Sequence, residues 1–193
     1  MAKKNKNSLI KTITLAVFFV SIILIYFHYI ANVNKNVKRE PNKDELEQLV
    51  HYDMINDYPK SARDVVKLHC RYSKLIYANE LTDDELTMLC NCMRQLYAKE
   101  LLQYNPANTA VQALKNDIKR MEEEEYKYKS YTLPEASQIQ YYNQYGVDMA
   151  TMEVTITMGT KDEVGYYYQQ YVLVEEDGKW KILAWGESKM GQK

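Results

Sequence analysis

The sequence predicts an α+β fold, in which helices pack on a curved antiparallel β-sheet behind an N-terminal transmembrane helix. Three observations favour this class. An almost unbroken apolar run occupies Ile13 to Ala31. From residue 44 to about residue 125, apolar side chains recur at the spacing of three and four that is typical of amphipathic helices. After Tyr126 the period changes to two, which is typical of strands.

The apolar run predicts a transmembrane signal anchor over residues 12–31, preceded by a basic tail over residues 1–11. A helix of this length, at about 1.5 Å per residue, matches a hydrocarbon core of roughly 30 Å. A cleaved signal peptide is the alternative. However, the run is longer than the apolar region of such peptides, and Tyr29 stands where a small residue would be needed before a cleavage site at Ala31. We therefore expect an uncleaved anchor.

Basic residues flank the predicted anchor in nearly equal numbers on both sides, so the positive-inside rule favours one orientation only slightly. Four lysines precede it, with Lys11 directly beside the helix, while three lysines and Arg39 follow it closely. A folded domain can cross a membrane largely regardless of its own charge. The sequence therefore predicts a single-pass protein of the cell membrane, with a cytoplasmic N-terminus and an extracytoplasmic C-terminal domain.

Charge is distributed unevenly along the chain. Residues 32–43 are polar and rich in Asn and Lys, which predicts a linker. Residues 44–193 are enough for one domain with its own core, and they contain 17 basic and 25 acidic residues, a net charge of −8. Because affinity for nucleic acid depends on neutralising phosphates, no nucleic-acid partner is expected.

Four helices are predicted in the first half of the domain, each from a start signal followed by an apolar stripe. The first is expected to extend to Pro59, which ends it. The third begins with a complete capping box of Thr82 and Glu85, and its apolar stripe predicts a helix without a break to Leu101. Their expected N-cap residues are Asn42, Ser61, Thr82 and Asn105.

The second half of the domain alternates as strands, and two turns determine how these strands pair. Asp177-Gly178 is the strongest hairpin signal in the chain. A two-residue turn there pairs Glu175 with Trp180, Leu173 with Ile182, and Tyr171 with Ala184. A four-residue loop over residues 160–163 pairs Tyr167 with Ile156 and Tyr171 with Met152. Both hairpins place one set of side chains on the face expected to pack on the helices: Met152, Ile156, Tyr167, Tyr171, Leu173 and Ile182.

The three cysteines are an odd number, which is unlike an oxidised disulfide scaffold. Cys90 and Cys92 would point about 200° apart on one helix, so they are poorly placed to share a metal. We expect buried free thiols, with a disulfide between Cys70 and Cys90 as the alternative. His51 and His69 add no ligand spacing, so neither a metal nor a cofactor is expected.

The order of helices followed by long antiparallel strands, ending in Asp177-Gly178-Lys179-Trp180-Lys181-Ile182, resembles the nuclear transport factor two-like superfamily over roughly residues 61–187. The layout of anchor, spacer and domain is similar to membrane-anchored proteins of unknown function from Gram-positive bacteria. The resemblance implies a cone-shaped sheet wrapped around a helix, with a pocket at its open end. The helix from Pro106 to Glu125 is long for this superfamily, and we expect it to cover that pocket or replace part of it.

The first functional hypothesis is an extracytoplasmic binding or assembly module without catalytic activity. The chain contains 18 tyrosines, and tyrosine is enriched at interfaces. If Tyr167 faces the core, Tyr166 and Tyr168 lie on the outer face and form a candidate interaction surface. Besides the membrane contacted by residues 12–31, the expected partner is an unknown protein or small molecule, and a homodimer through the sheet is a further expectation.

The alternative is a small-molecule-binding protein, or an isomerase- or hydrolase-like enzyme, that uses the pocket of the cone-shaped sheet. Such an isomerase needs a carboxylate base and a hydrogen-bond donor in an apolar cavity. The candidate bases, Asp148 and Glu153, are expected at a solvated turn and on the polar side of a strand, so no catalytic residue is assigned. The candidate pocket residues are His69, Tyr72, Tyr97, Tyr141, Met152, Ile156 and Tyr167.

A third hypothesis is an anchored protein whose helical half, and not its sheet, recruits a partner. The helix between Asn42 and Tyr58 would discriminate it: its apolar side chains are core if the helix packs on the sheet, and an interaction surface if it stands free.

Overall fold

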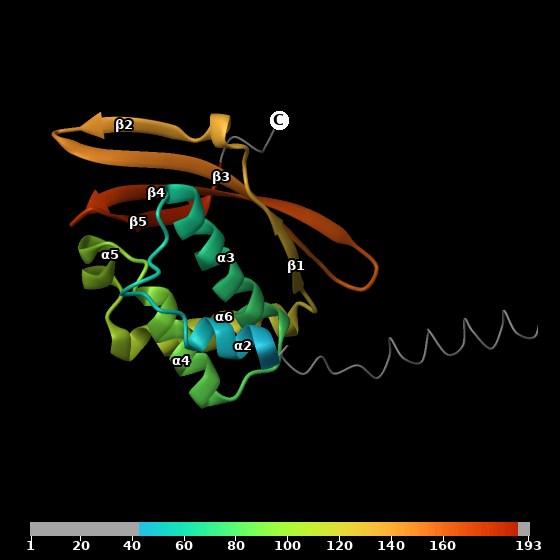
Figure 1. Ribbon diagram of the computed structural model, residues 1–193. Coiled ribbons are helices and arrows are strands. Elements are labelled where there is room, and N and C mark those ends of the chain that lie inside the picture. The colour runs from blue at the N-terminus through green and yellow to red at the C-terminus, as the bar shows by residue number, and fades with distance from the viewer. Residues whose placement is uncertain (1–42, 189–193) are drawn as a thin grey trace, which may run out of the picture. The chain divides into compact units, whose positions relative to one another are not determined.

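The computed structural model describes residues 43–188, which lie within the compact unit Pro41–Lys193. Helices form the first half of this unit and an open antiparallel sheet forms the second, which confirms the α+β class (Figure 1). The helices are α2 (Lys43–Val50), α3 (Ala62–Ala78), α4 (Asp83–Arg94), α5 (Lys99–Tyr104) and α6 (Ala107–Glu123).

The predicted anchor over residues 12–31, the basic tail and all of the linker except Lys43 lie outside the described residues. Between Lys43 and Ser188, no helix has the length and apolar character needed to cross a membrane.

Two of the predicted helix starts are confirmed in atomic detail. The Ser61 hydroxyl accepts a hydrogen bond from the backbone N–H of Asp64, at 3.1 Å, and begins α3. Thr82 and Glu85 form the reciprocal capping box that begins α4. The last helix starts one residue later than expected, because Pro106 and not Asn105 is its N-cap.

Two predicted helices are shorter than expected. The first ends at Val50, well before Pro59, and the Asp53 carboxylate then accepts hydrogen bonds from the backbone N–H groups of Ile55 and Asn56 in a turn. The third ends at Arg94. Residues 96–98 leave the helix because they pair with a strand: Ile182 N–H donates to the Leu96 carbonyl and Ala98 N–H donates to the Ile182 carbonyl, both at 2.8 Å.

Helix α2 does not stand free but packs on α3 and α4, so its apolar face belongs to the core. Leu49 is fully buried, and its carbonyl accepts a hydrogen bond from the Tyr72 hydroxyl at 2.8 Å. All three cysteines are free, and Cys70 and Cys90 are buried, as expected for small apolar side chains.

The sheet has the order β1-β3-β4-β5, and β2 pairs with a second part of β3. The register confirms four predicted pairs: Ile156 with Tyr167, Met152 with Tyr171, Leu173 with Ile182, and Glu175 with Trp180. The backbone of Asp177 and Gly178 is left-handed, as the predicted hairpin turn requires. The strands are β1 (Lys127–Thr132), β2 (Gln140–Gln144), β3 (Val147–Gly159), β4 (Val164–Glu176) and β5 (Lys179–Glu187).

One predicted pair is wrong, because a β-bulge interrupts the ladder between β4 and β5. Beyond Leu173 and Ile182, Val172 pairs with Ala184, so Leu183 is an extra residue on β5. Tyr171 therefore pairs with Trp185 and not with Ala184. Since side chains alternate along a strand, one extra residue moves all later side chains to the opposite face.

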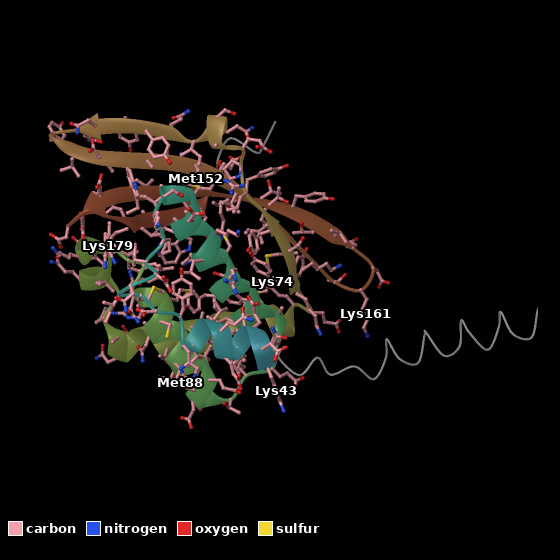
Figure 2. All side chains as sticks on the ribbon, in the orientation of Figure 1. Lys43, Lys74, Met88, Met152, Lys161 and Lys179 are labelled. Atoms are coloured by element: carbon pink, nitrogen blue, oxygen red, sulfur yellow. The ribbon has the colours of Figure 1, made fainter. Side chains whose placement is uncertain are left out.

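We call the sheet face that carries Met152, Ile156 and Tyr171 the inner face, because it is the face covered by the helices. Helix α3 packs on β1 and β5 along this face. Side chains fill the space between α3 and the sheet, with Met152 among them (Figure 2). The bulge places Trp185 and Glu187 on the inner face as well.

Candidate ligand-binding cavity

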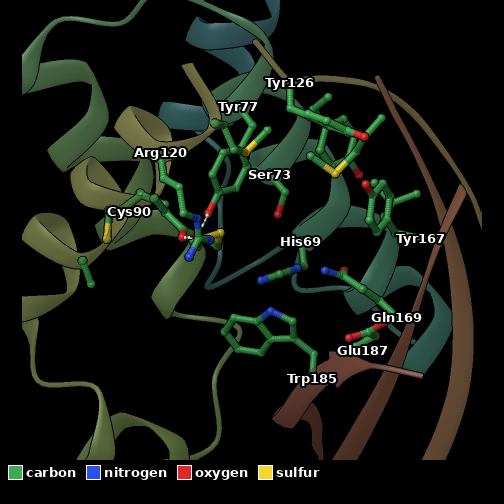
Figure 3. A pocket seen from close by; sticks show the side chains of 18 of the residues that line it. His69, Ser73, Tyr77, Cys90, Arg120, Tyr126, Tyr167, Gln169, Trp185 and Glu187 are labelled. Carbon is green, nitrogen blue, oxygen red and sulfur yellow. Dashed lines mark hydrogen bonds and ion pairs between the residues drawn. The ribbon is translucent and has the colours of Figure 1, made fainter. Parts of the chain in front are cut away.

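A cavity of about 780 Å³ lies between the inner face and helices α3, α4 and α6 (Figure 3). Strands β3, β4 and β5 form one wall with Ile156, Tyr167 and Trp185. Ser73 of α3 and Leu114 of α6 contribute to the opposite side. A volume of this size is in the range of about 300 to 1,000 Å³ that is typical of small-molecule sites.

A chain of hydrogen bonds centred on His69 lies beside the cavity. His69 Nδ1 is 3.1 Å from the Tyr171 hydroxyl, and its Nε2 is 3.4 Å from the Tyr97 hydroxyl. The Tyr171 hydroxyl is also 3.3 Å from Gln169 Oε1. One direction satisfies every group: Tyr97 donates to Nε2, Nδ1–H donates to Tyr171, and Tyr171 donates to Gln169. We call these four side chains the His69 network.

Burial determines the charge of the His69 network. His69 has almost no exposed surface, and this desolvation lowers its pKa from 6.5 to about 3. Burial also raises the pKa of Tyr97 and of Tyr171 far above 10.0. All three groups are therefore neutral at physiological pH, and both imidazole nitrogens are occupied by hydroxyl groups.

The bulge brings Trp185 over the His69 network. Its ring centroid is 4.9 Å from that of His69 and 5.2 Å from that of Tyr97. Figure 3 shows the indole beside the imidazole at the edge of the cavity. Because 37% of the Trp185 surface is exposed, the ring covers the network on one side and faces the cavity on the other.

Two tyrosines and two carboxylates line another part of the cavity. The rings of Tyr126 and Tyr167 meet edge to face with their centroids 6.3 Å apart. The pKa of Tyr167 is raised, first by a hydrogen bond with Tyr126, then by burial, and also by the charges of Glu124 and Glu187. The negative charges of Glu124 and Glu187 thus both raise the pKa of the Tyr167 hydroxyl. We call Glu124, Tyr126, Tyr167, Trp185 and Glu187 the aromatic–acidic rim.

The two cationic side chains of the lining are already paired with protein groups. Arg120 forms an ion pair with Asp117, whose other carboxylate oxygen accepts a hydrogen bond from the Tyr77 hydroxyl at 3.2 Å. Arg94 donates to the backbone carbonyl of Asn105. The Arg120–Asp117 pair lies within α6, the Tyr77 hydroxyl joins it to α3, and Arg94 joins the end of α4 to the segment before α6.

Tyr128 contributes a buried hydroxyl without a partner. The residue belongs to β1, lines the cavity and is 7% exposed. Over residues 43–188, its hydroxyl is the one buried side-chain oxygen or nitrogen that lacks a hydrogen bond. An unpaired buried hydroxyl costs about 1 to 3 kcal/mol.

Four of the seven candidate pocket residues line the cavity, and three do not. Tyr72 points toward α2, where it donates to Leu49, and Met152 is buried farther along the inner face. Tyr141, on β2, is 55% exposed, and its ring centroid is 5.6 Å from that of Trp180. The four that line the cavity are His69, Tyr97, Ile156 and Tyr167.

The candidate interaction surface lies on the outer face, as the register predicts. Tyr166 pairs with Thr157 and is 65% exposed. Tyr168 pairs with Thr155 and is half-buried, and its backbone carbonyl accepts a hydrogen bond from Ser188 N–H at 2.7 Å. Tyr168 also contributes to the cavity lining, so these two tyrosines do not form one uniform surface.

The carboxylates considered as catalytic bases are not in the cavity. Asp148 accepts a hydrogen bond from Asn143 Nδ2, at 2.8 Å, at the β2–β3 turn. Glu153 contacts the Ser188 hydroxyl. Within the described part of the chain, no group of His, Cys, Asp and Glu side chains has the arrangement of a metal site.

Sequence reasoning missed most of the aromatic–acidic rim. The alternation of β5 places Trp185 and Glu187 on the outer face unless Leu183 is counted as a bulge, and nothing in the sequence marks that bulge. Glu124 belongs to a run of four glutamates at the end of a predicted helix, a pattern typical of a solvated helix face and not of a ligand site. Tyr126 had a signal, because it directly follows that helix at the change of period.

Comparisons with known proteins give a family and two distant likenesses. No curated protein matches the chain. The transfer protein TraH of the Gram-positive conjugative plasmid pIP501 is similar at 12% identity, with a TM-score of 0.39 over 68% of this chain and 94% of TraH. The intermembrane-space region of the chloroplast protein ARC6 is similar at 12% identity, with a TM-score of 0.33 over 65% and 92% of the two chains.

A family model covers almost all of the sequence. It is described as Domain of unknown function (DUF6715), and it matches residues 1–185. The matched region includes the apolar run, all described helices and most of β5. The chain therefore belongs to the DUF6715 family.

Proposed function

We propose that this protein is a membrane-anchored binding module without catalytic activity, which holds a small organic ligand in the cavity beneath the inner face. The observation that carries the proposal is an open cavity of about 780 Å³ whose lining includes the buried, fully hydrogen-bonded His69. Ligand sites of this kind combine apolar and aromatic walls with a few fixed polar groups.

The His69 network favours binding over catalysis. A general base works best when its pKa is close to the operating pH, whereas burial lowers that of His69 to about 3. Its Nε2 and Nδ1 are also occupied by Tyr97 and Tyr171. The network instead holds Gln169 and the surface under Trp185 in fixed positions.

The membrane anchor and the extracytoplasmic location are part of the same proposal. Their support is the apolar run over residues 12–31, together with a family model that begins at residue 1 and so includes this run. The nuclear transport factor two-like fold also stays a proposal. It is supported by the order of helices and strands and by a cavity against the inner face.

A protein partner at the outer face is the second candidate function. The supporting observation is that Val164 and Tyr166, which alternate onto the same face of β4, are 55% and 65% exposed. A homodimer through this face is one form of the proposal. Sedimentation of the full chain and of Tyr166→Asp tests it, because the charge would disperse a dimer that this face forms.

Ligand binding is tested by filling the cavity from α3. Ser73→Trp places a large ring in the lining, and Ser130→Trp makes the same change on the exposed surface of β1. The full chain, in micelles of an uncharged maltoside detergent, is titrated calorimetrically with phenyltrimethylammonium, tert-butylbenzene and benzenesulfonate. We expect saturable binding of at least one probe, lost in Ser73→Trp and kept in Ser130→Trp.

Two results would contradict the proposed function. One is the absence of saturable binding for all three probes. The other is equal binding by the two tryptophan variants, which would place the probe outside the cavity.

A further inference from the structure

We propose that the ligand is an organic cation with an apolar body, bound with its charge near Glu124 and Glu187 and its body against the rings of Tyr126, Tyr167 and Trp185. This inference rests on the proposed binding function and names the chemical class of the ligand. It follows from three properties of the aromatic–acidic rim: unpaired negative charge, exposed aromatic surface and the convergence of both on one part of the cavity.

The first step is the charge that is left without a partner. Among the described residues, neither Glu124 nor Glu187 takes part in an ion pair, whereas Asp117 is paired with Arg120. Arg94 donates to a backbone carbonyl. That carbonyl is neutral, so Arg94 keeps its positive charge, and the charged side chains of the lining (Arg94, Asp117, Arg120, Glu124 and Glu187) sum to −1. The aromatic–acidic rim itself contains two carboxylates and no cationic side chain.

The second step is the aromatic surface beside this charge. Tyr167 and Trp185 are 41% and 37% exposed, although they lie on the inner face, where Met152, Ile156 and Tyr171 are at most 3% exposed. Aromatic faces attract cations within about 6 Å of the ring centroid, and tryptophan does so most strongly. An apolar cation gains from both the rings and the carboxylates, whereas an anion is repelled by both.

The third step is the arrangement that makes these groups converge. The register pairs Glu187 with Gln169, two residues from Tyr167 on the same face. On the opposite side, α6 ends and Glu125 adopts a left-handed conformation, with φ of 55°. The backbone N–H of Tyr126 then donates to the Met121 carbonyl at 2.8 Å, which turns the chain and sets Tyr126 beside Tyr167.

Figure 3 shows this convergence. Tyr126 and Tyr167 lie together along one side of the cavity, and Glu187 and Trp185 lie below them, beside Gln169. The rim is therefore built from the end of α6 and from two neighbouring strands, elements that are far apart in the sequence.

The test compares probes of one shape and different charge. Phenyltrimethylammonium and tert-butylbenzene have the same shape, and benzenesulfonate supplies the opposite charge. With the full chain in uncharged maltoside micelles, we expect the cation to bind about five- to thirtyfold more tightly than its neutral isostere. Added salt should reduce this preference, because exposed charges are screened.

Two double variants test whether the preference for the cation over its neutral isostere arises from the aromatic–acidic rim. The double variant Glu124→Gln/Glu187→Gln should reduce the preference for the cation severalfold, leaving the part that the rings contribute, and should leave binding of the neutral probe unchanged. Glu122→Gln/Glu175→Gln removes the same charge from residues outside the cavity lining and should keep the preference. Tyr167→Leu should weaken cation binding severalfold, whereas Tyr167→Phe, which keeps the ring, should not.

The outcomes separate this inference from the proposed function. If the neutral or anionic probe binds inside the cavity as tightly as the cation, the binding function stands and the ligand class is overturned. If the cation is preferred equally after both double variants, the preference does not arise at the rim and the inference is again overturned. If no probe binds, the proposed function itself fails.

Discussion

The inner face of the sheet has two halves that differ in how they are covered. In the closed half, Met152, Tyr171, Leu173 and Ile182 are at most 3% exposed. In the open half, Tyr167 is 41% exposed on the same strand as Tyr171. Since the strands and the face are the same, the difference must come from the helices. A cavity separates the open half from α3, α4 and α6, whereas the side chains of the closed half belong to the hydrophobic core.

The two halves are expected to contribute to different properties, the closed half to the stability of the fold and the open half to ligand binding. Residues of the closed half contribute the buried apolar area that stabilises the fold. Residues of the open half leave large aromatic surfaces exposed, which is costly for stability and useful for a ligand. The comparison predicts that substitutions in the two halves will have opposite consequences for unfolding and for binding.

The largest expected effect comes from truncating the closed half. Leu173 is fully buried, so Leu173→Ala should lower the free energy of unfolding by about 2 to 5 kcal/mol, through lost burial and the cavity it leaves. Tyr167→Ala in the open half should cost less than about 1 kcal/mol but weaken binding of the probes. Chemical denaturation of both variants measures the contrast, and equal losses of stability would remove the distinction between the halves.

A smaller effect is expected from pH, through His69 at the boundary of the two halves. The unfolded imidazole binds a proton below pH 6.5, whereas burial lowers the folded pKa to about 3. Between these values the unfolded state binds more protons, so the free energy of unfolding falls as the pH is lowered. At pH 5 the loss is about 2 kcal/mol, and above about pH 7.5 the contribution is constant.

The variant His69→Gln isolates this contribution, because it keeps hydrogen-bonding groups but does not titrate. Denaturation of both proteins at pH 8 and pH 5 should show a loss for the wild type that exceeds the loss for the variant. An identical pH dependence of the two proteins would show that His69 is accessible to protons in the folded state.

The smallest effect should come from two tyrosine hydroxyls, one hydrogen-bonded between α3 and α2 and one without a partner at the cavity. Tyr72 donates to the Leu49 carbonyl, so Tyr72→Phe should cost about 1 kcal/mol. Tyr128 lines the cavity and its hydroxyl has no partner among residues 43–188, so Tyr128→Phe should be neutral or stabilise by up to about 1 kcal/mol. Thermal unfolding of the two variants checks the signs, and a clear loss in Tyr128→Phe would reveal a hydrogen bond to bound water.

Two helix starts and the last hairpin could be predicted from the sequence. Ser61 and Thr82 began helices as their capping patterns indicate, and the Asp177-Gly178 turn set the pairing of Leu173 with Ile182. These features depend on interactions between residues that are close in the chain. Local chemistry is therefore enough to predict them.

The end of the third helix and the position of Trp185 depend on interactions that the sequence does not display. The third helix ends at Arg94 because Leu96 and Ala98 form hydrogen bonds with Ile182, which is more than 80 residues away. The hydrophobic periodicity continues to Leu101 and therefore predicted a longer helix. The bulge at Leu183 is also invisible in the alternation of the strand. It is tertiary pairing that decides both features.

The bulge at Leu183 makes chain length, and not only residue identity, a determinant of the rim. Removing one residue between Gly178 and Trp185 would turn the indole and the Glu187 carboxylate to the outer face while leaving every side chain of the rim chemically intact. The number of residues between Gly178 and Trp185 therefore decides whether the indole and the Glu187 carboxylate reach the cavity.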